Sequence, residues 1–154
     1  MKLTTQEILQ IVLQDASGEA PPEGALLTSA VVDSRQAGPG SLFIALPGER
    51  TDGHAYVAHA FSRGAQAALI GRPVDAPGVL IDARGPLALP SLTAGEPVCI
   101  LVEDPLAALQ RVAAAWRARF SPRVIGITGS VGKTTTKEIT AAVLRQRFVT
   151  LKNQ

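Results

Sequence analysis

One hexapeptide of this chain has the composition of a phosphate-binding loop: Gly129-Ser130-Val131-Gly132-Lys133-Thr134. Glycines let successive backbone N–H groups turn toward an anion, and a helix that begins at Lys133 adds the positive end of its dipole there. The lysine suits the terminal phosphates of a nucleotide, and the threonine hydroxyl suits Mg²⁺. We therefore expect ATP and Mg²⁺ as cofactors, with Lys133 and Thr134 as catalytic groups and Thr134 as the metal ligand. The residues expected to bind the nucleotide are Gly129, Ser130, Val131, Gly132, Lys133, Thr134 and Thr135.

The residues on both sides of this hexapeptide support the prediction. The run 124–127 is apolar and rich in β-branched residues, as in a buried strand, while Ile139 and Val143 have helical spacing after the loop. The general pattern of such loops has a glycine at position 127, whereas this chain has Ile127 and places Gly126 one residue earlier. The alternative is an ordinary turn between strand and helix, but such a turn needs one glycine and neither the lysine nor the threonine.

A second candidate, Asp33-Ser34-Arg35, stands where a strand is expected to end. Arginine is suited to bidentate contact with a phosphate or a carboxylate. Taken alone, the tripeptide favours a structural turn closed by an ion pair. His54 and His59 have no cysteine or carboxylate set at ligand spacing, so no zinc site is expected.

The segment Thr128 to Glu138 resembles the ATP loop of the Mur ligases, the ATP-dependent amide-forming enzymes of peptidoglycan precursor synthesis. The loop of that family also departs from the general pattern at its first glycine. Further segments resemble the family in the same order along the chain: Asp33-Ser34-Arg35, then Pro39 to Ala45, then Gly48 to His54. The resemblance extends from Thr4 to Asn153, nearly the whole chain.

This resemblance implies a substrate and a reaction. In the family, the N-terminal domain holds the UDP end of a UDP-N-acetylmuramoyl peptide. ATP phosphorylates a substrate carboxylate, and an incoming amine then displaces phosphate to form an amide. The residues that the resemblance assigns to substrate binding are Ser34, Arg35, Glu49, Arg50 and Thr51.

The residues inside the loop indicate which family member is most similar. Ser130 and the pair Lys137-Glu138 are most similar to the member that adds D-alanyl-D-alanine to a UDP-N-acetylmuramoyl-tripeptide. The preceding member, which adds a diamino acid, more often has Thr-Asn between the glycines, and it stays open as an alternative. A third interpretation, from another class, is a UDP-sugar or nucleotide-binding module without catalysis.

The elements that must position these residues predict an α/β fold. We expect a small N-terminal α/β domain that binds the UDP precursor over 1–121. Over 122–154 we expect the first strand, phosphate loop and helix of a P-loop ATPase-like central domain. The expected strands are 26–32, 42–46, 65–70, 79–81, 98–102 and 124–127, and the expected helices are 4–13, 55–63, 105–120 and one after Lys133.

The last residues, Thr150 to Gln154, resemble the opening of the family's Thr-x-x-Asn-x-Asn segment. We therefore expect the N-terminal portion of a longer ligase, with an incomplete central domain and no turnover by itself. A core built from residues 123–154 alone would be too small, because a stable sheet requires three or more strands with a covered face.

Composition excludes several other classes of protein. The chain is 46% hydrophobic and 18% charged, with a net charge of +2, so neither nucleic acid nor an anionic membrane is an expected partner. The only cysteine, Cys99, rules out an internal disulfide and lies in an apolar run typical of a buried position. The N-terminus has no signal-peptide pattern. We expect a cytoplasmic monomer whose partners are small-molecule substrates.

Overall fold

The computed structural model describes residues 1–13, 24–48, 51–85, 92 and 95–153. They form two compact units, Met1–Phe120 and Ser121–Gln154. The division falls one residue before the boundary expected from the sequence. The functions expected for the two units stay predictions.

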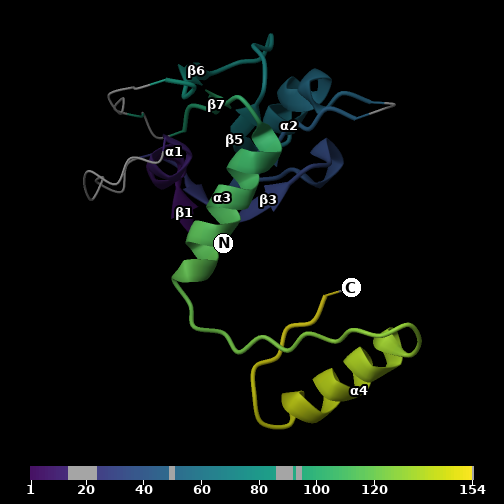
Figure 1. Ribbon diagram of the computed structural model, residues 1–154. Coiled ribbons are helices and arrows are strands. Elements are labelled where there is room, and N and C mark those ends of the chain that lie inside the picture. Colours follow the sequence, from purple (N-terminus) through teal and green to yellow (C-terminus); the bar gives the residue numbers. More distant parts are fainter. Residues whose placement is uncertain (14–23, 49–50, 86–91, 93–94, 154) are drawn as a thin grey trace. The chain divides into compact units, whose positions relative to one another are not determined.

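The first unit is built on a parallel sheet of five strands in the order β3-β4-β5-β7-β6, with helices on its two faces (Figure 1). Sequence and structure therefore agree on an α/β fold. The strands are β3 (Ser29–Val31), β4 (Ser41–Ile44), β5 (Ala65–Ile70), β6 (Val79–Asp82) and β7 (Val98–Leu101). The central strands β4 and β7 are buried at every position, as expected where helices cover both faces of a parallel sheet.

The N-terminal helix α1 (Thr5–Leu13) covers most of the expected helix 4–13 and begins with a capping box. The Thr4 N–H donates to Glu7 Oε2 at 2.6 Å, and the Glu7 N–H donates to Thr4 Oγ1 at 3.2 Å. The expected strand 26–32 is divided into two. Its first part, β2 (Leu26–Leu27), pairs antiparallel with β1 (Leu3–Thr4), and only the second part, β3, joins the main sheet.

Apolar clusters cover the two faces of the sheet. On one face, α1 and α3 (Pro105–Ala118) pack against the sheet in a cluster that includes Leu69 and Ile100 of the strands and Val112 of α3. The other face packs against α2 (Val57–Ser62). Two short 3₁₀ helices, η1 (Ser34–Gln36) and η2 (Gly53–Tyr56), lie on the connections that follow β3 and β4.

The connections after β5 and β7 leave on opposite faces. Val74 and Ala76, which follow β5, pack on the α2 face, whereas Ala108 and Val112 of α3, which follows β7, pack on the α1 face. β5 and β7 are therefore adjacent strands whose connections leave on opposite faces, an arrangement called a switch point. Open α/β sheets bind ligands at such a point, outside the carboxyl ends of the strands.

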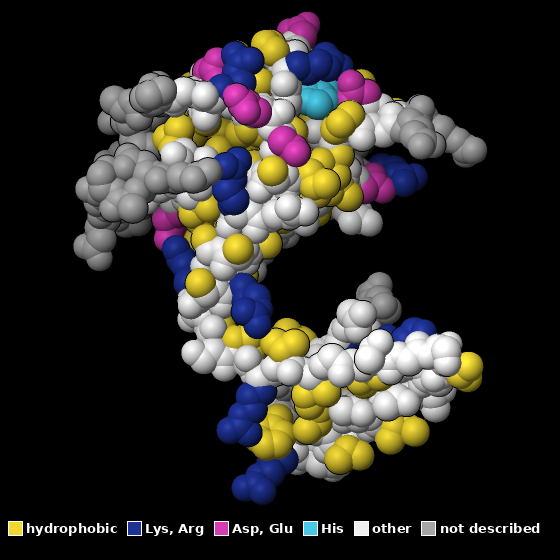
Figure 2. Space-filling model, in the orientation of Figure 1, with side chains coloured by type: hydrophobic (Ala, Val, Ile, Leu, Met, Phe, Trp, Pro, Cys, Tyr) yellow, Lys and Arg dark blue, Asp and Glu magenta, His cyan; other side chains and the backbone are white. Residues whose placement is uncertain are grey.

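The second unit contains α4 (Lys133–Arg145) preceded by an extended segment. The strand expected at 124–127 is absent, because no described segment pairs with it and a strand requires a partner for its backbone hydrogen bonds. Val124, Ile125, Ile139 and Val143 are exposed, and Figure 2 shows hydrophobic side chains on the surface of this unit. Among the described residues, only Ala141 of this unit is a buried hydrophobic residue.

No helix among the described residues is long and apolar enough to cross a membrane. Cys99 lies in β7 with 4% of its surface exposed, and burial raises the pKa of its thiol to about 11.

The cap of α3 gives a first test of the fold. Asp104 Oδ1 accepts from the N–H groups of Leu106 (2.8 Å) and Ala107 (3.1 Å). We expect Asp104→Ala to lower the free energy of unfolding of the first unit by about 1 kcal/mol, the usual cost of losing an N-cap. Denaturant unfolding followed by the fluorescence of Trp116, the single tryptophan, measures it. The neighbouring substitution Glu103→Ala is the control, and an equal loss in both variants would contradict the capping role.

Candidate functional site

The predicted nucleotide loop is exposed and joins directly to α4. Gly129 has φ 151° and Gly132 has φ 79°, backbone conformations that favour glycine over other residues. Gly132 is the N-cap of α4, and the Thr136 N–H donates to the Gly132 carbonyl at 2.9 Å. The first N–H groups of a helix have no partner inside it, so this end of α4 can accept an anion.

The Lys133 side chain folds back over the loop. Its Nζ donates to the carbonyl oxygen of Gly129, four residues earlier. The ammonium group is therefore held at the loop by a neutral acceptor, which a phosphate oxygen can replace with a stronger, charge-assisted hydrogen bond. Thr134 and Thr135 are exposed on the first turn of α4.

The chain from Thr150 to Asn153 returns to the first half of α4. The Lys137 Nζ donates to the Asn153 carbonyl at 2.9 Å, and the Lys152 Nζ donates to Glu138 Oε2. The hydrogen bond from Lys152 lowers the pKa of Glu138. Glu138 therefore pairs with Lys152 in this structure. The spacing of residues along the sequence did not predict this contact.

The residues of this unit fit a magnesium ion only in part. The described residues contain no cluster of three His, Cys, Asp or Glu side chains that could hold a metal. Mg²⁺ keeps several waters and takes one or two protein ligands alongside substrate phosphates, so the single hydroxyl of Thr134 is compatible with it.

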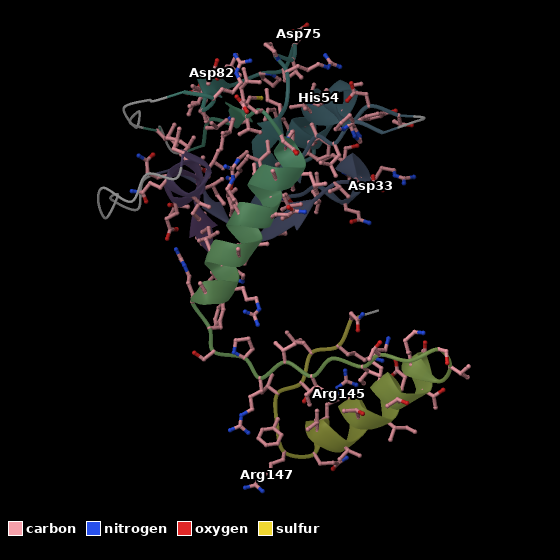
Figure 3. The ribbon with its side chains drawn as sticks, in the orientation of Figure 1. Asp33, His54, Asp75, Asp82, Arg145 and Arg147 are labelled. Carbon is pink, nitrogen blue, oxygen red and sulfur yellow. The ribbon has the colours of Figure 1, made fainter. Side chains whose placement is uncertain are left out.

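The second candidate site lies at the carboxyl edge of the sheet in the first unit. Asp33 follows β3, His54 follows β4 and Asp82 ends β6, and Figure 3 labels these three side chains. Acidic, basic and histidine side chains gather at this end of the unit (Figure 2). Parallel strands bring their carboxyl ends to one edge, which explains why residues far apart in sequence lie at this edge.

At the end of β3, Asp33 and Arg35 form an ion pair across the turn η1. Arg35 Nε donates to Asp33 Oδ1 at 3.0 Å and Nη2 donates to Oδ2 at 2.7 Å, while the Arg35 N–H also donates to Oδ1. These hydrogen bonds lower the pKa of Asp33 to about 2. The structure thus has the turn with an ion pair that the tripeptide favours when taken alone. The Arg35 side chain is 83% exposed and keeps N–H groups free of Asp33.

Ser34 is buried below this pair and is held by a histidine from α2. The distance from Ser34 Oγ to His59 Nδ1 is 3.0 Å. No role for His59 follows from the sequence alone, because its contact with Ser34 joins residues 25 positions apart.

A third group at this edge joins the ends of β4 and β5. Asp52 accepts from His54 Nδ1 at 2.6 Å and from Arg72 Nη2 at 2.7 Å, and His54 Nε2 accepts from the Gly71 N–H at 2.8 Å. Hydrogen bonds from Arg72 and then His54 hold the pKa of Asp52 well below its usual range. Of the predicted substrate loop, Thr51 is exposed, while Glu49 and Arg50 lie outside the described residues.

Comparison with known proteins identifies the family. The profile described as "Mur ligase family, catalytic domain" matches residues 28–117, which is more than half of the chain. The chain belongs to the Mur ligase family. The matched range contains the edge with Asp33, Arg35 and His54 and ends before the nucleotide loop.

Individual Mur ligases extend the similarity beyond that range. The UDP-N-acetylmuramoyl-tripeptide–D-alanyl-D-alanine ligase of Synechocystis sp. is 42% identical over 124 residues, which is 80% of this chain and 24% of that protein. The solved structure of UDP-N-acetylmuramoylalanyl-D-glutamyl-2,6-diaminopimelate–D-alanyl-D-alanyl ligase from Acinetobacter baumannii has a TM-score of 0.68 and 32% identity, covering 96% of this chain and 29% of that one.

A third Mur ligase structure contains a nucleotide. The MurF ligase from Thermotoga maritima in complex with ADP has a TM-score of 0.57 and 30% identity, and the match covers 77% of this chain and 23% of that one. The present chain thus spans between 23% and 29% of the length of these relatives.

The Asp33–Arg35 pair predicts a pH dependence. Because the pKa of Asp33 is depressed in the fold, the pair stabilises the fold above the usual aspartate pKa, and this stabilisation is lost as the pH falls toward about 2. We expect Arg35→Ala to raise the pKa of Asp33 from about 2 toward 3.8, measured by ¹³C NMR of the carboxyl group. Asp82, paired with Arg84 in the same way, should keep its pKa of about 2. A midpoint near 3.8 for Asp33 in the unmodified chain would contradict the assignment.

Proposed function

We propose that this chain serves an ATP-dependent ligase that adds D-alanyl-D-alanine to a UDP-N-acetylmuramoyl-tripeptide. The observation that carries the proposal is the joint presence of the glycine loop with Lys133 at the start of α4 and the family-matched sheet edge with Asp33 and Arg35. Ser130 and the pair Lys137-Glu138 favour this member over the one that adds a diamino acid.

In the proposed reaction, the nucleotide loop of this chain contributes positive charge at fixed positions. The N–H groups at the start of α4 would bind phosphate oxygens, and the Lys133 Nζ would exchange the Gly129 carbonyl for a phosphate oxygen. The Thr134 hydroxyl would hold a magnesium ion in part, and that ion would supply further charge neutralisation. Transfer of phosphate to a carboxylate depends mostly on such positioning and electrostatic stabilisation.

The first unit would bind the UDP end of the precursor. Arg35 is exposed and is already oriented by Asp33, so its free N–H groups are arranged for a phosphate at little cost in side-chain entropy. Ser34 and Thr51 are the other described residues assigned to substrate binding. Glu49 and Arg50, which directly precede Thr51 in the sequence, are assigned to substrate binding as well.

Nucleotide binding can be tested in the 154-residue chain. We expect Lys133→Ala to weaken MgATP binding about tenfold or more, because a charge-assisted hydrogen bond is lost. Isothermal titration calorimetry measures this. Lys137→Ala is the matched control, since its Nζ lies one turn later on α4 and bonds to the Asn153 carbonyl. Equal affinities in the parent and Lys133→Ala would remove the loop assignment. No sustained ATP hydrolysis by the chain alone is expected.

Binding of UDP has its own test. We expect UDP to shift the amide NMR signals of residues 33–35 and of Thr51, and Arg35→Ala to weaken the binding about tenfold. Arg84→Ala is a matched control, because Arg84 pairs with Asp82 in nearly the same geometry but follows the edge strand β6. If millimolar UDP produced no shifts, or if both arginine variants weakened binding alike, the assignment of this edge would fail.

A further inference from the structure

The loop between β4 and η2 is closed at its base. The Gly53 N–H donates to the Leu46 carbonyl at 3.0 Å, so the two ends of the loop meet. A Cβ at Gly53 would lie 2.9 Å from both the N and the O of Leu46, and one at Gly48 would lie 2.8 Å from the Thr51 carbonyl. These close approaches leave no room for a side chain at either glycine.

The described part of this loop has no apolar anchor of its own. Pro47, Gly48 and Thr51 are all exposed, and none belongs to the apolar clusters that cover the sheet. The described residues of this loop are therefore held by the hydrogen bonds at its base rather than by hydrophobic packing.

His54 forms the centre of that base. Its side chain is 5% exposed. Because a backbone N–H can only donate, the bond from Gly71 means that Nε2 is an acceptor, and the neutral ring must then carry its proton on Nδ1. Nδ1 donates that proton to Asp52 Oδ1, which also accepts the His54 backbone N–H at 2.9 Å. One ring thus ties the loop to the end of β5.

Asp52, at the end of the loop, completes its connection to the residues that follow β5. Its second oxygen, Oδ2, accepts from Arg72 Nη2, so both carboxylate oxygens have partners. The space beside Gly71 is filled as well: a Cβ there would lie 3.3 Å from Pro105 Cδ at the start of α3 and 3.5 Å from His54 Nε2. The base of the loop is therefore fixed at the switch point between β5 and β7.

We propose that His54 is a positioning residue for the uridine diphosphate substrate. With Asp52 and Gly71 it forms a clamp that holds Thr51 in the geometry that binds the substrate. This inference rests on the proposed function of the first unit. A purely structural role would require the ring to support the sheet, but the apolar clusters on both faces are made by other residues.

Two substitutions at His54 separate the arms of the clamp. In His54→Asn, the amide nitrogen can replace Nδ1 and keep the bond to Asp52, while the Gly71 N–H loses its acceptor. In His54→Gln, the longer side chain can offer an oxygen to the Gly71 N–H, while the bond to Asp52 is lost. Asp52→Asn weakens the hydrogen bonds that the carboxylate accepts from His54 and Arg72, while the His54 side chain itself is unchanged. Asp82→Asn is the matched control, because Asp82 also pairs with an arginine and a backbone N–H two residues later.

The measurements use the 154-residue chain and UDP. We expect the three clamp variants to increase the fast backbone motion of Thr51 and Gly53 in ¹⁵N relaxation and to weaken UDP binding about tenfold, since each loses a hydrogen bond to a charged or buried group. Asp82→Asn should change neither quantity. Trp116 fluorescence should report an intact first unit in all four variants.

The outcomes distinguish this inference from the proposed function. UDP binding that is equal in the parent and the clamp variants overturns the positioning role and leaves the proposed function standing. No UDP binding by the parent chain overturns the proposed function and the inference with it. Unfolding of all three clamp variants shows that the cluster supports the sheet itself and also overturns the positioning role.

Discussion

The parallel pairing of β4, β5 and β7 is the constraint on which the first unit depends. Neighbouring parallel strands need crossover connections, so the chain must leave the sheet at one edge and return at the other. Both faces of these strands are then covered, which accounts for the apolar runs Leu42 to Ile44 in β4 and Val98 to Leu101 in β7. The same pairing places every carboxyl end at one edge, where polar side chains can meet without interrupting the apolar clusters.

Short-range patterns in the sequence predicted much of this fold. The capping box at Thr4, the Asp104-Pro105 start of α3 and the apolar run of β5 depend on neighbours within a few residues, and the structure has all three features. The ion pair between Asp33 and Arg35 belongs to the same class, because its partners are two positions apart.

Contacts between distant residues were beyond the reach of these patterns. Gly71 and Arg72 join Asp52 and His54 only because β4 and β5 are neighbours, and a sequence pattern does not give the order of strands in a sheet. The strand expected at 124–127 was wrong for a related reason. Its residues favour a strand, but a strand forms only where another strand supplies hydrogen-bond partners.

Because Cys99 is buried in the sheet, thiol reagents react with it only slowly in the native state. Only a thiolate reacts readily, and a thiol in β7 with a pKa of about 11 and 4% exposure supplies very little of it in the native state. Modification must therefore wait until β7 opens, so its rate reports the free energy of that opening. Cys99 is the only cysteine in the chain. The rate at which a thiol reagent modifies it therefore measures local opening of the sheet without an introduced cysteine.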